Sequence, residues 1–373
     1  MVKRVIAAAA ASLVVAAPAY ASVPSVGARA YFIVDATTGD VLAQKNADRQ
    51  LPIASITKLM TVHVALQSRL ALDDPVVVRR AVAAVGESSI DLRPGQRISA
   101  GDLLKGALIQ SANDAADALA DRYGPGETAF VARMNAEARR LHLTHTHFAR
   151  PDGLDAPGHV STARDVTRLA QVAMRSSIVR MLVRRRAATI ATGRTLHTWN
   201  DLLGEFRGLD GVKTGHTGGA GWCEVAEVKR DGLDLYATVL GSPSRGQRNS
   251  DLAALLRWAT AIERPAWVVA PGRVYVRVPA GYGHPAVPLV AQRAVARPIR
   301  TDVALTERIT APAAVSLPVH RGDRLGEVRI YSGRRLLARQ PLVAARAVAR
   351  PGLAGRVGFY TGRTFSHIGS WFT

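Results

Sequence analysis

The spacing of hydrophobic residues changes along the chain from a strand pattern to a helix pattern. The segment ARAYFIVDATTGDVLAQ contains two short apolar runs joined by a Thr-Thr-Gly-Asp turn, which predicts a hairpin at the edge of a sheet. From Ser55 onward the spacing is helical, and one side is formed by Ile56, Leu59, Met60 and Val64. The sequence therefore predicts that a helix begins at Ser55.

Further helices and then a second group of strands follow. Helical spacing continues over residues 100–141, in DLLKGALIQ, NDAADALADRY and ETAFVARMNAEARRL. Strand patterns return in GVKTGHTGGAGWCEVAEV and LDLYATVLG, before a last helix in SDLAALLRWATAI. Because strands stand at both ends with helices between them, we expect an α+β domain over residues 22–262, with an antiparallel sheet and a helical cluster.

The pattern changes again after Glu263-Arg264-Pro265. Only short apolar runs remain, such as RVYVRV, AVPLV and EVRIY, and glycine and proline separate them. We expect a small all-β domain over residues 263–350.

The first 21 residues have the pattern of an export signal. Lys3 and Arg4 precede an apolar, alanine-rich run over residues 5–17, and Ala19-Tyr20-Ala21 is a small-residue cleavage site. The run is shorter than the roughly 20 apolar residues of a membrane span. We therefore expect residues 1–21 to be removed and the protein to act at the periplasmic, extracytoplasmic face of the cytoplasmic membrane.

The last segment, residues 351–373, is amphipathic when it is projected as a helix. One face collects Leu353, Val357, Tyr360, Ile368 and Trp371. This predicts that residues 352–373 associate peripherally with a membrane surface. The alternative is a frayed tail or a strip packed on the β domain, because glycine weakens an isolated helix.

Charge and composition limit the classes of partner and cofactor. The chain has 49 Lys and Arg against 29 Asp and Glu, and its formal net charge is +20. In the cytosol this balance would point to nucleic acid, but an exported protein meets lipid headgroups and cell-wall polymers instead, so we expect no nucleic-acid partner. The only cysteine, Cys223, is predicted to be buried in a strand. His142, His145 and His147 lack a matching cysteine or carboxylate group, and we expect neither a metal site nor a cofactor.

Lysine is rare among the basic residues, and Lys58 stands three residues after a serine. Only six of the 49 basic residues are lysine. Ser55 and Lys58 would share one face of a helix, where the lysine could take the proton of the serine hydroxyl. Its pKa would have to fall from near 10.4 to near 7, which corresponds to about 4 kcal/mol. Burial and a second cation, for which Lys213 is the candidate, both act in that direction, whereas arginine keeps its proton.

Two further motifs accompany this pair. Ser111-Ala112-Asn113 falls in the turn before a helix that begins near Asp114, so both polar side chains can face a cleft. Lys213-Thr214-Gly215-His216 enters a strand, and its glycine would let a peptide lie alongside. Each motif alone is weak, but their order, spacing and elements make the joint signal strong.

The three motifs, S-x-x-K, S-x-N and K-T-G, resemble those of penicillin-binding proteins and class A β-lactamases. More narrowly, the chain is similar to the D-alanyl-D-alanine carboxypeptidases of peptidase family S11, which are low-molecular-weight penicillin-binding proteins. The resemblance runs from about Ala28 through the β domain, and it includes ASITKLMT, LLKGALIQSANDAADALA and GLDGVKTGHTGGAGWC. It implies a penicillin-binding-protein/β-lactamase-like transpeptidase domain followed by the small β domain.

The resemblance implies catalytic roles for three residues. Ser55 would be the acylated nucleophile, Lys58 its base, and Ser111 a proton relay to the departing D-alanine amine. Asn113 would hold the substrate amide, and Lys213 would set the electrostatics of the pocket.

Further residues would bind the substrate. Thr214 and Arg248 would hold its terminal carboxylate, with Arg245 close enough to compete for the second role. The backbone N–H groups of Ser55 and His216 would form an oxyanion hole, next to Gly215.

Two positions fall outside these roles. Glu224 replaces a residue that is usually apolar in the family, and we expect it to touch no reacting group. His159 lies in a loop that the family uses near the cleft, and a structural role is equally open.

The implied function is removal of the terminal D-alanine from peptidoglycan pentapeptide stems, with β-lactam antibiotics as covalent inhibitors. A DD-endopeptidase of the same superfamily remains an alternative. A wall-binding or scaffold protein without catalysis is the other alternative, although the intact motifs argue against it. A class A β-lactamase would need a glutamate between the second and third motifs, and the corresponding residues 148–165 contain none.

Overall fold

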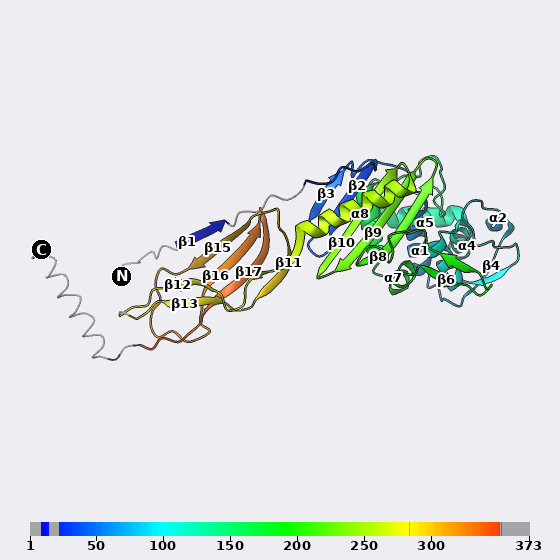
Figure 1. Ribbon diagram of the computed structural model, residues 1–373. Coiled ribbons are helices and arrows are strands. Elements are labelled where there is room, and N and C mark those ends of the chain that lie inside the picture. The colour runs from blue at the N-terminus through cyan, green and yellow to red at the C-terminus, as the bar shows by residue number, and fades with distance from the viewer. Residues whose placement is uncertain (1–8, 15–21, 283, 351, 353–373) are drawn as a thin grey trace, which may run out of the picture. The chain divides into compact units, whose positions relative to one another are not determined.

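The chain folds into two compact units, each with hydrophobic cores of its own. One comprises residues 21–261, and the other comprises residues 262–373 together with residues 1–20. The computed structural model describes residues 9–14, 22–282, 284–350 and 352 (Figure 1).

The first unit is built on a five-stranded antiparallel sheet with the strand order β3-β2-β10-β9-β8 (Figure 1). Its strands are β2 (Ala30–Asp35), β3 (Val41–Lys45), β8 (Leu209–Thr217), β9 (Gly221–Arg230) and β10 (Leu233–Ser242). The predicted hairpin is confirmed as β2 and β3, and β3 lies at one edge. Strands from the beginning and the end of the unit share one sheet, as predicted for the α+β class.

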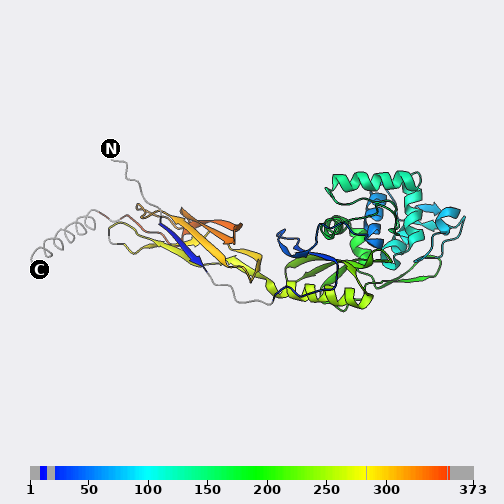
Figure 2. The same ribbon diagram turned by 90° about the horizontal axis from the view of Figure 1, so that it is seen from above.

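Helices lie on both faces of this sheet (Figure 2). One face is covered by α8 (Arg245–Ile262). The opposite face carries the helical cluster that the sequence places between β3 and β8: η1 (Ala54–Thr57, a 3₁₀ turn), α1 (Lys58–Gln67), α2 (Arg80–Ala83), α3 (Ala100–Lys105), η2 (Gly106–Gln110, a π-helical turn), α4 (Asn113–Tyr123), α5 (Glu127–Arg140), α6 (Ala163–Ala173) and α7 (Ser177–Val183). Two short hairpins accompany it: β4 (Pro75–Val77) with β5 (Arg97–Ser99), and β6 (Ala187–Thr189) with β7 (Thr195–His197).

Side chains of β9 alternate between the two faces, as a strand requires. Cys223 and Val225 belong to the core beneath the helical cluster, whereas Ala226 and Val228 belong to the core beneath α8. By the same alternation Glu224 points toward α8, and it is fully buried. A charged residue therefore occupies a core position behind the edge strand β8.

The predicted helix in DLLKGALIQ is interrupted. It runs as α3 and continues as the π-helical turn η2, after which Ser111 adopts a left-handed conformation with φ of +66°. Asn113 then begins α4. A π-helical turn often marks a functional site, and here it ends at the second predicted motif.

In its described residues the second unit is all-β, which confirms the all-β class predicted for the chain after Glu263. Its main sheet has the order β1-β15-β16-β17-β13-β12, and β11 pairs separately with β14. The strands are β1 (Ala9–Val14), β11 (Glu263–Val269), β12 (Val274–Val278), β13 (Val287–Ala291), β14 (Val295–Arg300), β15 (Leu305–Ala311), β16 (Arg324–Ser332) and β17 (Arg335–Ala344). Its core includes Val287, Leu289, Val328 and Leu342.

The two chain ends carry predictions that fall largely outside the described residues. Within the predicted export signal, residues 9–14 form β1, antiparallel to β15. Of the predicted tail, only Gly352 is described. Both assignments stay predictions. Among the helices that the structure describes, none is long and apolar enough to cross a membrane.

Candidate active site

The first motif brings Ser55 and Lys58 together at the start of the helical cluster. Ser55 lies in the 3₁₀ turn η1, and Lys58 is the first residue of α1. The Lys58 Nζ donates a hydrogen bond to the Ser55 Oγ at 2.8 Å. The predicted spacing of three residues therefore gives direct contact, which general-base activation of a serine requires.

Lys58 is completely buried, and three acceptors surround its amine. Besides the Ser55 Oγ, the Nζ donates to the Asn113 Oδ1 at 2.7 Å and to the backbone oxygen of Asp152 at 2.6 Å. Burial lowers the pKa of Lys58 to about 8, although nearby carboxylates, Asp152 foremost, oppose this change. At that pKa roughly a tenth of the amine is neutral at pH 7.

A second lysine–serine pair faces the same pocket. The Lys213 Nζ, on β8, donates to the Ser111 Oγ and to the backbone oxygen of Thr214, both at 2.8 Å. Burial lowers the pKa of Lys213 well below its ordinary value, and the charge of Lys58 adds to the effect. At Lys58 itself burial is the main cause, and the predicted effect of Lys213 on the pKa of Lys58 stays a prediction.

Asn113 connects the first and second motifs. Its Oδ1 accepts from Lys58, while its Nδ2 donates to the backbone oxygen of Gly86 at 3.0 Å. The backbone N–H of Asn113 donates to Ser88 at 2.7 Å. The loop around residues 86–88 therefore fixes this amide at the wall of the pocket.

The glycine of the third motif has a use in packing besides the one predicted, which stays a prediction. A Cβ on Gly215 would lie 2.8 Å from the backbone oxygen of Ile53 and 3.0 Å from the backbone nitrogen of Ser55. The missing side chain thus lets β8 pack directly against η1. Gly215 therefore positions the nucleophile turn, besides any space it leaves for a substrate.

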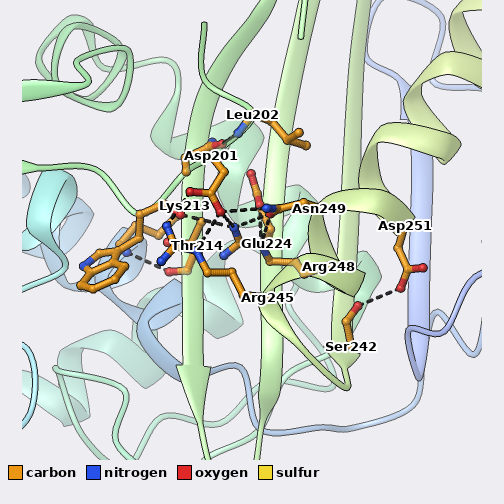
Figure 3. Close-up of polar contacts among 12 residues, drawn as sticks. Asp201, Leu202, Lys213, Thr214, Glu224, Ser242, Arg245, Arg248, Asn249 and Asp251 are labelled. Atoms are coloured by element: carbon orange, nitrogen blue, oxygen red, sulfur yellow. Dashed lines mark hydrogen bonds and ion pairs between the residues drawn. The ribbon is translucent and has the colours of Figure 1, made fainter. Parts of the chain in front are cut away.

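Arg248 reaches the pocket from the α8 side of the sheet. Its side chain is only 1% exposed, and it lines the pocket together with Thr214. The Arg248 Nη2 donates to the Asp201 Oδ2 at 3.2 Å (Figure 3). It also donates to the backbone oxygen of Trp199 at 3.3 Å. Arg245 instead pairs with Asp201 through two nitrogens, at 2.7 and 2.5 Å. Of the two arginines, Arg248 is the one that faces the cavity.

His216 also lines the cavity, and it stacks on Trp222 with ring centroids 4.1 Å apart. The cavity has a volume of about 180 Å³. Its walls combine Ser55, Glu87, Ser88, Ser111, Asn113, Trp199, Thr214, Gly215, His216, Trp222 and Arg248. The three motifs therefore share one pocket, with Lys58 and Lys213 buried behind its serines.

Comparison with known proteins identifies the family that carries this site. The sequence profile of peptidase family S11, described as D-alanyl-D-alanine carboxypeptidase, matches residues 17–244. The chain belongs to this family. The prediction from its motifs is confirmed, and the protein is a serine-type carboxypeptidase of the penicillin-binding-protein class.

Some relatives of this carboxypeptidase extend over both units, and others match a smaller part of the chain. D-alanyl-D-alanine carboxypeptidase DacC from Escherichia coli (strain K12) is 31% identical over 372 residues, which are 94% of this chain and 92% of that protein. The crystal structure of penicillin binding protein 6B from Escherichia coli covers 88% of this chain and 99% of that chain, with a TM-score of 0.67 and 29% identity. The structure of the Streptomyces K15 DD-transpeptidase has a TM-score of 0.61 and 34% identity, and covers 65% of this chain and 100% of that chain.

Glu224 of this carboxypeptidase contacts a predicted substrate-binding residue. It was expected to touch no reacting group, which stays a prediction, and its Oε2 is 3.0 Å from the Arg248 Nε. Both side chains are at most 1% exposed. Because α8 crosses behind the edge strand, the position after Cys223 meets Arg248, a contact that residue spacing along β9 could not reveal.

His159 connects a loop by hydrogen bonds to η1, the turn that carries the predicted nucleophile Ser55. Its Nδ1 accepts from the backbone N–H of Ala149 at 3.0 Å, so its Nε2 carries the proton and donates to the Thr57 Oγ1 at 2.8 Å. Burial lowers the pKa of His159 to about 4. The neutral imidazole thus ties the loop after α5 to η1, which favours the structural role.

Three further observations on this carboxypeptidase concern its cysteine, possible metal ligands and the loop before β8. Cys223 is buried as predicted, and burial raises the pKa of its thiol to about 11. No group of three or more His, Cys, Asp or Glu able to hold a metal ion occurs in the described part of the chain. The sequence motifs did not point to Trp199 or Asp201. The polar residues Thr198, Asn200 and Asp201 stand together between strands and were the available signal.

Proposed function

We propose that this carboxypeptidase removes the terminal D-alanine from peptidoglycan pentapeptide stems through an acyl-enzyme on Ser55. The main support is the 2.8 Å contact between the Ser55 Oγ and the Lys58 Nζ at the wall of the shared pocket. Burial lowers the pKa of Lys58 to about 8, so the amine can act as a base near neutral pH.

The proposed reaction has two halves. Neutral Lys58 takes the proton of Ser55 while its oxygen attacks the carbonyl carbon of the penultimate D-alanine. The C–N bond then breaks, and the leaving D-alanine amine receives a proton through Ser111. Water then attacks the ester carbonyl, Lys58 returns its proton to the departing Ser55 oxygen, and the proton given up by the water restores the Lys213–Ser111 pair. The carboxylic acid formed loses its proton to the released amine. The contact of Ser111 with Lys213 at 2.8 Å supports the relay, because the lysine can replace the proton that is passed on.

Two binding roles follow from the remaining lining residues. Thr214 and Arg248 hold the substrate's terminal carboxylate, because a buried guanidinium is the natural partner of a carboxylate. The backbone N–H groups of Ser55 and His216 stabilise the developing oxyanion. The close packing of β8 on η1 at Gly215 supports this pairing.

The site is also the target of β-lactam antibiotics in this proposal. Penicillin would acylate Ser55 by the same attack, and its carboxylate would occupy the position of the peptide terminus. Export through residues 1–21 and peripheral membrane association through residues 352–373 complete the proposal.

The test uses purified protein and a pentapeptide that ends in D-Ala-D-Ala. We expect the loss of one alanine by mass spectrometry, and covalent labelling by fluorescent penicillin. Ser55→Ala should abolish both while leaving the thermal unfolding temperature nearly unchanged. If the protein neither releases alanine nor binds penicillin covalently, the scaffold alternative replaces the proposal.

A cross-linked muropeptide dimer separates the endopeptidase alternative. The proposal expects D-alanine release from the pentapeptide to be much faster than cleavage of the dimer. Faster cleavage of the dimer would assign the protein to the endopeptidases instead.

A further inference from the structure

Glu224 occupies the core between β9 and α8, directly behind the substrate-facing edge of the sheet. In the β-ladder it stands opposite Thr214 of β8, so both side chains lie on the α8 face. Its carboxylate is completely buried, and its Oε2 is 3.0 Å from the Arg248 Nε (Figure 3). Glu224 thus lies on the strand next to β8, the strand that carries Thr214 of the proposed carboxylate site.

This carboxylate is held by charge and not by hydrogen bonds. Neither of its oxygens accepts a hydrogen bond from a described residue. A buried carboxylate without hydrogen bonds costs stability, and apolar residues of similar size commonly do better at such positions. Stability alone therefore does not explain why a glutamate occupies position 224.

The hydrogen bonds of Arg248 use its Nε and Nη2 and leave Nη1 for the pocket. Nε and Nη2 donate to the Asn249 Oδ1, at 3.0 and 2.5 Å, and Nη2 also reaches Asp201. No hydrogen bond of Nη1 to a described residue is present, and Arg248 lines the cavity. The carboxylate of Glu224 faces Nε and interacts with it by charge, which leaves Nη1 for a ligand.

We propose that Glu224 is a positioning residue whose charge sets how tightly Arg248 holds the C-terminal carboxylate of the substrate. Ionised Glu224 neutralises part of the Arg248 charge and weakens the attraction for an anion. Protonated Glu224 leaves Arg248 uncompensated from behind, so the substrate carboxylate binds more tightly. The proposal rests on the proposed function, because it takes Arg248 as the carboxylate-binding group.

The charged groups around Glu224 are consistent with titration near neutral pH. They are Lys213 from β8, Arg248 from α8 and, from the loop before β8, Asp201, which is itself paired with Arg245. Burial raises the pKa of Glu224 to about 7, Asp201 acts in the same direction, and Arg248 and Lys213 act against it. A bound anion beside Arg248 raises it further, so binding takes up a proton and KM rises as the pH increases through about 7.

The test measures KM and kcat for a D-Ala-D-Ala peptide between pH 6 and pH 8. Wild-type KM should rise roughly three- to tenfold across this range, the size expected of one charge acting through a partly solvated pocket. In Glu224→Gln, KM should stay at the low-pH value throughout, with kcat changed less than twofold. The Ki of the same peptide with a C-terminal amide should respond neither to pH nor to the variant, because it lacks the carboxylate.

Glu227→Gln is the matched control on the same strand. Glu227 is also buried, burial raises its pKa, and it accepts from the Tyr236 hydroxyl at 2.8 Å on the opposite face of the sheet. Its loss should leave the KM profile unchanged. The wild-type profile tests the proposal even if Glu224→Gln folds poorly, which a thermal melt would reveal.

Three results would overturn this proposal. They are a flat wild-type KM, an equal response of the amide peptide, and a Glu224→Gln profile equal to that of wild type. All three leave the proposed function standing. If wild type fails to release D-alanine at any pH, the proposed function fails first, and the two failures are thereby distinguished.

Discussion

At the residue scale, Lys58 occupies a buried position that is unfavourable for a charged amine and therefore favours its use as a base. A buried amine loses hydration, which favours its neutral form, and burial lowers the pKa of Lys58 to about 8. Three oxygen acceptors within 2.8 Å keep the amine oriented toward Ser55 while it is protonated. The same environment therefore orients the base and makes its proton available.

This environment predicts how acylation depends on pH. Lys58 acts as a base only when neutral, so the acylation rate at saturating penicillin should rise about tenfold per pH unit below pH 8 and level off above it. Lys58→Arg keeps the charge but holds its proton, so its rate should be roughly 10²- to 10⁴-fold lower and lack this rise. Stopped-flow labelling with fluorescent penicillin measures both. An arginine variant that keeps the wild-type rate would exclude Lys58 as the base.

Residue types and spacing were enough to predict the reacting groups, but not the buried charge that contacts a predicted substrate-binding residue. Ser55 and Lys58 are three residues apart, so local geometry brings them together, and a known motif order linked them to Ser111 and Lys213. The contact between Glu224 and Arg248 joins a strand and a helix 24 positions apart. Such contacts depend on how α8 crosses the sheet, which no local pattern encodes.

At the element scale, the site depends on how β8 and η1 pack together. Gly215 permits backbone approach at a point where a Cβ would meet the backbone of Ile53 and Ser55. The sequence predicted the strand and a helix from Ser55, although the first turn is 3₁₀ and α1 begins at Lys58. It could not predict that the glycine serves the contact between the two elements. The π-helical turn η2 was missed for a similar reason, since its residues have ordinary helical spacing.

Gly215→Ala tests this contact. The added methyl should push η1 away from β8, with an overpacking cost of about 1–3 kcal/mol, and slow penicillin acylation by at least tenfold. Gly218→Ala in the following turn is the matched control, because its Cβ would meet nothing within 4 Å. Labelling rates and chemical denaturation of both variants check the prediction. Equal acylation rates in the two variants would show that the close approach is dispensable.

His159 joins a loop to the same nucleophile turn, and it should make stability depend on pH. Its pKa is about 4 in the folded protein against an ordinary value near 6.5, so the unfolded chain binds more protons between these values. The free energy of unfolding should therefore fall as the pH decreases from about 6.5 to 4, by up to about 3 kcal/mol. His159→Gln cannot take up this proton, so the difference between wild type and variant should shrink toward pH 4. Urea denaturation at several pH values measures this difference, and a constant difference would contradict the assignment.

At the scale of the whole molecule, the strong positive charge and the predicted tail give two different modes of surface attachment. A net charge of +20 attracts anionic surfaces, but salt screens this attraction over about 10 Å at 0.1 M. An amphipathic segment binds by burying apolar side chains, which salt does not weaken. The two modes can therefore be separated by ionic strength.

Removal of residues 352–373 tests which mode attaches the protein. The chain of residues 22–373 should sediment with vesicles of anionic lipid both at 0.1 M and at 1 M NaCl, because salt does not weaken the burial of apolar side chains of the tail. The shortened chain should sediment at low salt only, and should release D-alanine at the same rate as the longer chain, because the described residues that line the pocket lie between Ser55 and Arg248. Sedimentation assays at the two salt concentrations, with neutral vesicles as the control, measure the difference. If both chains detach at 1 M NaCl, charge alone accounts for attachment, and the amphipathic face of the tail has another use, such as packing on the β domain.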